Sequence, residues 1–168
     1  AMLRLNQAGD PMSLDQPAAI VKYQTPSRDA FLGGRVTIAQ PRRGFRAGLD
    51  SVLLGAAVGN LGGDLLDLGS GVGTAALVVL HHAAPAARAV LVENDPALLA
   101  LAKENLMANG LAARAQALLL DLTAPAGTRA DAGLKTDAFA AVIANPPYFA
   151  AGQGTAASAR GRAARHMP

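Results

Sequence analysis

An α/β fold with an open, parallel sheet is the fold class that this 168-residue sequence predicts. Short apolar runs alternate with helical segments, and such alternation implies parallel strands joined by right-handed crossovers. The runs are almost continuously apolar, which is typical of strands covered on both faces, so we expect three layers. Glycines or polar side chains follow each of the first four repeating strands, at the edge of the sheet where ligands bind in such folds.

The composition fits one domain with a closely packed core. Hydrophobic residues make up 51% of the chain but aromatic ones only 4%, so Leu, Val and Ala must fill the core. The absence of cysteine excludes disulfides and thiolate chemistry and agrees with a reducing compartment, so we expect a cytoplasmic protein. Apolar runs such as Ala75–Leu80 are far too short to span a bilayer, and the first residues lack a signal-peptide layout. We therefore expect no membrane partner.

Residues 1–48 are expected to form an N-terminal extension with a short β element. Residues 1–30 contain Pro11, Pro17 and Pro26 and should be mostly loop. Gly33-Gly34 indicates a turn, and the segment after it, residues 35–40, alternates polar and β-branched residues as a short strand does.

Residues 49–149 are expected to form the main domain, which opens with a helix over Ser51–Gly59 capped by Asp50. Asp95 as N-cap and Pro96 at the first helical position begin another helix, which Gly110 should end after about Asn109. The remaining predicted elements are strands at Asp64–Leu68, Arg88–Val92, Ala115–Leu120 and Ala138–Ala144, a glycine loop at Gly69–Gly73, a helix at Thr74–His82, and a loop at Pro125–Gly133 with room for a short helix.

The segment Asn145-Pro146-Pro147-Tyr148 follows the last of these strands. Its two prolines cannot donate ladder hydrogen bonds and therefore stop the strand. An amide side chain, an unpaired backbone carbonyl and an aromatic ring remain at the strand tip. Together these groups can hold the amino group of a planar substrate.

The three earlier strand tips suggest a nucleoside site. The loop is Gly-x-Gly-x-Gly rather than the Gly-x-Gly-x-x-Gly of dinucleotide binders, and the helix from Thr74 offers amide donors to a carboxylate. Glu93 stands where an acid clamps a ribose diol, and Asp121 could accept a hydrogen bond from the adenine amino group. A nucleoside that carries a carboxylate instead of a pyrophosphate is S-adenosylmethionine. Singly, the loop could be a tight turn, Glu93 a solvated acid, Asp121 a helix cap and Tyr148 a core residue; the agreement of four strand tips favours the cofactor site.

Three motifs, Asp67-Leu68-Gly69-Ser70-Gly71-Val72-Gly73, Val92-Glu93-Asn94-Asp95 and Asn145-Pro146-Pro147-Tyr148, resemble those of class I S-adenosylmethionine-dependent methyltransferases that modify amino nitrogens. The segment from Phe45 to Ala56 and the continuation Tyr148-Phe149-x-x-Gly152 are similar to the bacterial adenine-N6 methyltransferases that act on the anticodon loop of valine tRNA. The resemblance covers roughly residues 30–155.

The resemblance implies a Rossmann-like sheet, S-adenosyl-L-methionine as the cofactor, tRNA as the partner and no metal. The residues expected to bind the cofactor are Asp67, Gly69, Ser70, Gly71, Gly73, Glu93, Asp121 and Asn145. Those expected to act in catalysis are Asn145, Pro146 and Tyr148, with the Asn145 oxygen and the Pro146 carbonyl accepting hydrogen bonds from the target amino group and Tyr148 stacking on the base. Nucleic-acid contacts are expected from Arg42, Arg43, Arg46, Phe149, Arg160, Arg162 and Arg165; on charge alone, the arginine clusters fit a solvated surface equally well.

One departure from the family concerns length, because the fold it resembles has seven strands and only the first four are visible here. We predict strand order 3-2-1-4 and a fragment that is weakly active or inactive alone. We also expect its open edge to promote self-association and residues 150–168 to form a flexible basic tail.

Other functions remain open on the sequence. A protein-glutamine N5-methyltransferase could use the same amide clamp, although the arginine clusters and the segment around Asp50 argue against it. DNA adenine methylation is less favoured because no target-recognition region is visible. A non-catalytic nucleic-acid-binding module with a vestigial cofactor fold is the alternative from a different class.

Overall fold

A four-stranded parallel sheet is the centre of the computed structural model, which describes residues 25–44 and 46–146. Its strands lie in the order β5-β4-β3-β6. The bounds are Leu65–Leu68 for β3, Ala89–Glu93 for β4, Ala115–Leu119 for β5 and Ala141–Ala144 for β6. This order is the predicted 3-2-1-4 arrangement, and it places the carboxyl ends of β3 and β6 side by side.

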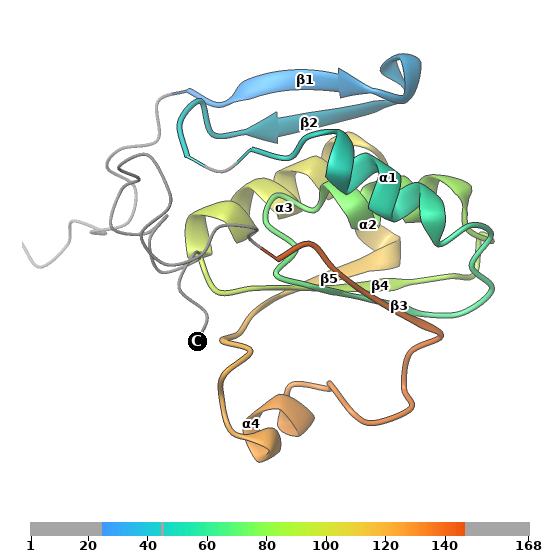
Figure 1. The fold of residues 1–168 in the computed structure, drawn as a ribbon, viewed down its shortest axis with the longest axis vertical. Helices are drawn as coiled ribbons and strands as arrows, with labels where there is room; N and C mark the ends of the chain where they lie inside the picture. Colours follow the sequence, from blue (N-terminus) through green and yellow to red (C-terminus); the bar gives the residue numbers. More distant parts are fainter. Residues whose placement is uncertain (1–24, 45, 147–168) are drawn as a thin grey trace, which may run out of the picture.

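Three longer helices cover one face of this sheet: α1 (Leu49–Ala57), α2 (Thr74–His82) and α3 (Pro96–Ala108). On the other side, the described residues contribute only the short α4 (Ala126–Asp131), well below the strands in Figure 1. The expectation that both faces are covered is therefore wrong for the described residues. Leu119 and Val142 show the consequence, since they are 58% and 57% exposed in their strands.

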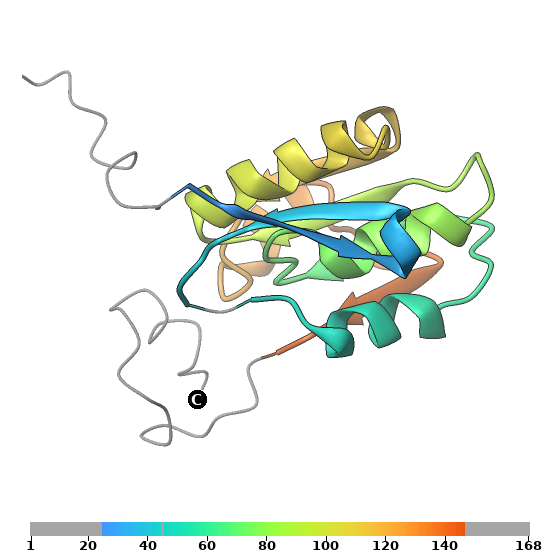
Figure 2. The ribbon, with the colours of Figure 1, turned by 90° about the horizontal axis from the view of Figure 1, so that it is seen from above.

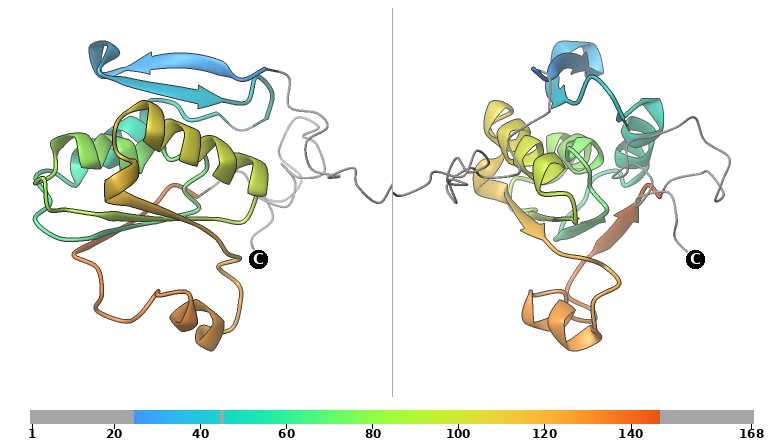
Figure 3. Two further views of the ribbon diagram at one scale, coloured as in Figure 1. Left: turned by 180° about the vertical axis from the view of Figure 1, so that it is seen from behind. Right: turned by 90° about the vertical axis from the view of Figure 1, so that its left-hand side faces the viewer.

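An antiparallel hairpin of β1 (Ser27–Phe31) and β2 (Val36–Gln40) lies across the helices, on the side away from the sheet (Figures 2 and 3). The turn η1 (Leu32–Gly34) joins the strands, with φ of 66° at Gly33 and 87° at Gly34. The predicted turn and second strand are thus confirmed. The loop predicted for residues 1–30 is wrong over β1, because the turn glycines fold the preceding residues back as a partner strand.

Helix α2 forms the middle of the core, between the hairpin and the sheet. Every residue from Thr74 to Leu80 is buried, as expected for a helix with apolar residues on all sides. Val36 and Ile38 of the hairpin pack in the same cluster as Leu77 of α2 and Leu91 of β4. The hairpin therefore shares the core of the sheet, and the domain boundary at residue 48 stays a prediction.

A seam of side-chain amides joins the hairpin to α3. The Asn105 amide accepts from the Ala39 N–H at 2.7 Å and donates to the carbonyls of Ala39 at 2.9 Å and Val72 at 3.0 Å. One turn later, the Asn109 amide bonds the N–H and the carbonyl of Thr37 at 3.0 and 2.8 Å. The two amides satisfy the edge of β2 in place of a neighbouring strand.

The element bounds mostly agree with the predictions, including the whole of α2 and the cap of α3, where the Asp95 side chain accepts from the Ala97 N–H. The predicted N-cap at Asp50 is wrong. Helix α1 begins at Leu49 with Gly48 as its N-cap, which places the Asp50 carboxylate in the first helical turn. A second short turn, η2 (Ala112–Arg114), leads into β5.

Candidate functional site

A pocket opens at the carboxyl ends of β3 and β6, between the glycine loop and the start of α1. Its walls come from α1 and the segment that enters it, the end of β3, the loop, the first turns of α2 and α3, and the residue after β6. The lining residues are Ala47, Ser51, Asp67, Gly69, Ser70, Gly71, Val72, Thr74, Ala75, Leu98 and Asn145. The structure therefore brings the glycine loop and Asn145 together, as predicted.

The backbone of the glycine loop requires glycine for two different reasons. Gly71 has φ of 57°, and a Cβ built there meets no atom within 4 Å in the described structure, so open space lies beside it. Gly73 has φ of 84°, and a Cβ there would lie 2.9 Å from Leu91 Cδ2 of β4. The loop thus lies tightly against the sheet at one end and leaves its backbone open to a ligand at the other.

Glu93, the last residue of β4, holds the loop from behind. It is only 8% exposed, and its carboxylate accepts hydrogen bonds from the N–H groups of Gly71, Asn94 and Asp95 at 2.8, 2.8 and 2.9 Å. The side chain therefore connects the glycine loop to the start of α3. Its predicted bond to a ribose diol stays a prediction.

Three side-chain oxygens in the pocket wall are buried without a hydrogen-bond partner among the described residues: Asp67 Oδ2, Ser70 Oγ and Thr74 Oγ1. Burial raises the pKa of Asp67 to about 7; a hydrogen bond from the Ala76 backbone opposes this shift, and the nearby Glu93 charge adds to it. Buried polar groups in folded proteins are nearly always paired. Three such oxygens in one wall, without partners among the described residues, indicate a site for a polar ligand.

Asn145 lies at the rim of this pocket and is held by the first turn of α1. Its Nδ2 donates to Asp50 Oδ2 at 2.8 Å and to Ser51 Oγ at 3.1 Å. The hydrogen bond from Asn145 is the main cause that holds the pKa of Asp50 below its usual value. Pro146, the next residue, is exposed, and the predicted role of its carbonyl as the second acceptor stays a prediction.

Asp121 does not line the pocket. Its side chain is exposed and accepts hydrogen bonds from the Thr123 N–H at 2.8 Å and Thr123 Oγ1 at 2.7 Å, which lower its pKa. Because these bonds close a local turn after β5, the carboxylate has a structural role of its own. The predicted contact with adenine stays a prediction.

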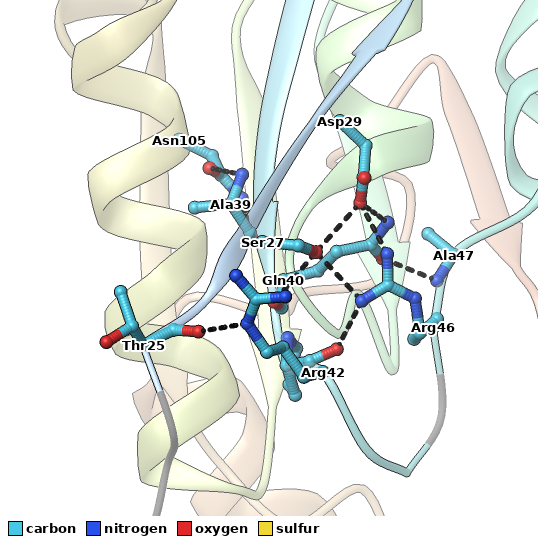
Figure 4. Close-up of polar contacts among 10 residues, drawn as sticks. Thr25, Ser27, Asp29, Ala39, Gln40, Arg42, Arg46, Ala47 and Asn105 are labelled. Atoms are coloured by element: carbon cyan, nitrogen blue, oxygen red, sulfur yellow. Dashed lines mark hydrogen bonds and ion pairs between the residues drawn. The ribbon is translucent and has the colours of Figure 1, made fainter.

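Of the residues predicted to contact nucleic acid, Arg42 and Arg43 are exposed on the loop after β2. Arg42 donates to the Thr25 carbonyl at 2.9 Å, as Figure 4 shows. Arg46 is only half exposed, because its guanidinium pairs with Asp29 and also donates to Ser27 Oγ and the Pro41 carbonyl. Arg46 therefore makes contacts within the protein, and its predicted role in binding RNA stays a prediction. Tyr148, Phe149, Arg160, Arg162 and Arg165 lie outside the described residues.

Sequence reasoning missed Ser51 and Thr74 as pocket residues. Thr74 directly follows the glycine loop, and that position was a usable signal. Ser51 lies 94 residues before Asn145 in sequence, and no local pattern connects the two.

Comparison with known proteins decides the family, because the methyltransferase small domain matches residues 49–163 of the chain. The chain belongs to this family. The match contains the glycine loop, Glu93 and the Asn145 segment, so the pocket described above lies within a methyltransferase domain.

Two curated relatives carry specific names. The chain is 36% identical over 130 residues to a tRNA1(Val) (adenine(37)-N6)-methyltransferase of Pectobacterium carotovorum, covering 76% of the chain and 50% of that protein. It is 36% identical over 99 residues to a release factor glutamine methyltransferase of Cereibacter sphaeroides, covering 59% of the chain and 32% of that protein. The chain spans about half the length of the first of these and a third of the second.

Solved structures agree with the fold of this methyltransferase domain. A SAM-dependent methyltransferase from Agrobacterium tumefaciens aligns with a TM-score of 0.55 at 19% identity, over 76% of this chain and 41% of the other. A predicted O-methyltransferase from the same species aligns with a TM-score of 0.51 at 31% identity, over 58% and 48% of the two chains. Both support the Rossmann-like arrangement.

The pocket of this methyltransferase domain fits S-adenosylmethionine by its donor set. The oxygens of Asp67, Ser70 and Thr74 that have no partner in the described part of the chain can bond the polar amino acid portion, and the open space beside Gly71 admits a ligand against the backbone. Within the described ranges, no group of three or more acidic or histidine side chains is placed to hold a metal ion. In the same part of the chain, no helix has the length and apolar character needed to cross a bilayer.

Proposed function

We propose that the protein transfers a methyl group from S-adenosylmethionine to the exocyclic N6 nitrogen of an adenine in tRNA. The observation that carries this proposal is the position of Asn145, whose amide stands at the rim of the pocket that the glycine loop forms. The choice of tRNA adenine rests on the Pectobacterium relative and on the resemblance of the motifs. We also propose that the protein works in the cytoplasm, a reducing compartment with which the absence of cysteine agrees.

The cofactor, when bound, supplies an electrophilic methyl group on a sulfonium sulfur. The residues of the chain then have the task of presenting a weak nucleophile to it. The Asn145 side-chain oxygen and the Pro146 carbonyl accept the two hydrogens of the amino group, which draws electron density onto nitrogen and directs its lone pair at the methyl carbon. Positioning of this kind, rather than a strong base, provides most of the acceleration.

Asp67, Ser70 and Thr74 are proposed to hold the amino acid end of the cofactor, because their buried oxygens have no partner in the described structure. Glu93 is proposed to bind the ribose while it fixes Gly71. Tyr148 is proposed to stack on the target base, and Arg42 and Arg43 to contact the RNA backbone. The arginines of residues 150–168 extend this proposed contact.

Methyl transfer by the full-length protein provides the test. Labelled S-adenosylmethionine is offered with tRNA, with DNA and with release-factor protein, and we expect label in tRNA alone, on adenine N6. Asn145→Ala should lower the rate of transfer by at least 100-fold, whereas Asn60→Ala, an exposed asparagine beyond the other end of α1, should leave it unchanged.

Calorimetry with S-adenosylmethionine separates the cofactor site from the substrate. We expect micromolar binding by the wild type and a loss of at least tenfold in Glu93→Ala. If label enters protein alone, the tRNA proposal is wrong and a protein-glutamine N5-methyltransferase is favoured. If the protein does not bind the cofactor, a vestigial cofactor fold is favoured.

A further inference from the structure

The amide of Asn145 has two chemically different ends, and methyl transfer to an amino group needs the oxygen end toward the substrate. An asparagine side chain can rotate by half a turn and exchange these ends at almost no steric cost. If the nitrogen end faced the pocket, it would donate to the substrate and could not accept from an amino group. Something in the site must therefore select one orientation.

The first turn of α1 provides that selection. Asp50 Oδ2 lies 2.8 Å and Ser51 Oγ 3.1 Å from Asn145 Nδ2. A carboxylate can only accept hydrogen bonds, so a rotated amide would place its oxygen against a negative charge. The lowered pKa of Asp50 accompanies this contact and keeps the group ionised near neutral pH.

The helix that carries Asp50 is itself fixed on both sides. Gly55 packs α1 directly against α2, since a Cβ there would lie 2.6 Å from the Ala75 carbonyl oxygen. The chain that enters α1 is held by Gln40, whose Oε1 accepts from the Ala47 N–H at 2.9 Å and whose Nε2 donates to Asp29 at 2.6 Å. Figure 4 shows this clamp, in which Arg46 binds the same Asp29 carboxylate.

We propose that Asp50, assisted by Ser51, is a positioning residue that keeps the Asn145 oxygen turned toward the substrate amino group. The proposal rests on the proposed function, methyl transfer to an amino nitrogen. It extends that function to a rule of specificity, because a site with this fixed orientation accepts hydrogen-bond donors and discriminates against substrates that present only acceptors.

Exchange of the two side-chain types tests the proposal. Asp50→Asn gives an amide at position 50 that can meet either end of Asn145, so kcat should fall five- to tenfold while the cofactor Kd stays within twofold of wild type. Asn145→Asp places two carboxylates together, and its kcat should fall by at least 100-fold. In that background Asp50→Asn restores an amide–carboxylate pair and should raise kcat at least tenfold.

The same substitution is thus expected to lower kcat in the wild-type background and to raise it in the Asn145→Asp background, a result that a general effect on α1 would not produce. Thermal unfolding without cofactor should show the same reversal, with a midpoint that falls in Asn145→Asp and recovers in the double variant. Asp131→Ala, an exposed acid on α4, serves as the matched control and should keep wild-type kcat.

Asp50→Asn effects of the same direction in both backgrounds, in kcat or in unfolding midpoint, would overturn the proposal. So would Asp50→Ala with kcat within twofold of wild type. If the wild-type protein methylates no amino group at all, the proposed function fails first, and the unfolding cycle still decides whether Asp50 orients Asn145.

Discussion

Polar side chains are buried in two regions, the seam between the hairpin and α3 and the wall of the pocket. They have hydrogen-bond partners in the first region but lack them in the second, among the described residues. In the seam, the fully buried Asn105 side chain uses both ends of its amide. Gln40, 2% exposed, does the same outside the seam, between Asp29 and the backbone of Ala47. In the pocket wall, Asp67, Ser70 and Thr74 each leave a buried oxygen without a partner among the described residues.

The difference separates structural from functional polar groups by a physical criterion. A buried polar group with its partners in place stabilises the fold, whereas one without them costs free energy until a ligand pairs it. Removing a polar group from the seam should therefore lower the free energy of unfolding, whereas removing one from the pocket wall should raise it.

The largest effect is expected in the seam, from Asn105→Ala. The substitution strands the Ala39 N–H and the carbonyls of Ala39 and Val72, which at roughly 1–3 kcal/mol for each buried group should lower the free energy of unfolding by about 4 kcal/mol. Urea unfolding measures it. Met107→Ala on the exposed side of the same helix is the control, with a change within about 0.5 kcal/mol. If Asn105→Ala lowers the free energy of unfolding by less than about 1.5 kcal/mol, the proposed difference between the seam and the pocket wall is contradicted.

The next effect concerns Asp67 and the pH dependence of stability. An aspartate has a pKa near 3.9 when unfolded, and burial raises the folded value to about 7. The folded state then keeps a proton that the unfolded state has lost, so the contribution to stability is complete below about pH 4 and disappears as the pH rises toward 7. The expected decline is on the order of 3 kcal/mol.

Asp67→Asn should remove that decline and leave the variant more stable than wild type at pH 8. Unfolding free energies at pH 5, 6, 7 and 8 check the slope. Parallel slopes for the two proteins would mean that Asp67 is ionised and paired in the fold. Cofactor affinity should fall in the same variant, because an amide replaces the proposed carboxylate ligand.

Substitutions of glycine are expected to have a smaller effect on stability. Gly73→Ala forces a left-handed φ on alanine and brings its Cβ to 2.9 Å from Leu91 Cδ2, so we expect a loss of about 2–3 kcal/mol. Gly59→Ala has a similar φ of 69° but no atom near its Cβ, and only about 1 kcal/mol should be lost. Chemical denaturation gives the free energy of unfolding of both variants, and their difference measures the cost of the contact with Leu91. If both variants lose the same amount, Leu91 moves aside.

The comparison also explains which features the sequence could predict. Local sequence patterns predicted the parallel sheet, all of α2, the Asp95 cap of α3 and the proximity of the glycine loop to Asn145. These features were predictable because apolar runs, caps and strand ends depend on residues that are close together in the sequence. Strand β1 and the true start of α1 were missed. Their positions depend on contacts between segments that are apart in sequence: β1 pairs with β2, and Gln40 of the hairpin holds Ala47, two residues before α1.

The candidate site divides in the same way. Gly69, Gly71 and Asn145 were found from motifs at strand ends, whereas the roles of Ser51 and Asp50 arise from a contact across more than 90 residues. Asp121 is a different case, since its side chain closes a turn with Thr123 in the described structure and its contact with adenine stays a prediction. Position at a strand tip predicts proximity to the site, but only three-dimensional pairing shows which groups are already used.

The smallest effect is the sharpest test of the comparison, because its sign differs from that of Asn105→Ala. Thr74→Val replaces a buried, unpaired hydroxyl with a methyl group of nearly the same shape at the start of α2. Since no hydrogen bond within the described structure is lost and the cost of burying the hydroxyl disappears, unfolding free energy should rise by about 0.5–1 kcal/mol. The affinity for S-adenosylmethionine should fall several-fold in the same variant if the hydroxyl binds the cofactor.

Thr128→Val in α4 is the matched control, since its side chain is exposed and its stability should change by less than about 0.5 kcal/mol. Differential scanning calorimetry and cofactor titration on the two variants give both quantities. A destabilised Thr74→Val protein would mean that the hydroxyl has a hydrogen-bond partner in the folded protein. The pocket wall would then be stabilised by its polar groups, as the seam is. A stabilised protein that binds the cofactor less tightly would show that the fold gives up stability at this position to keep a polar group for the ligand.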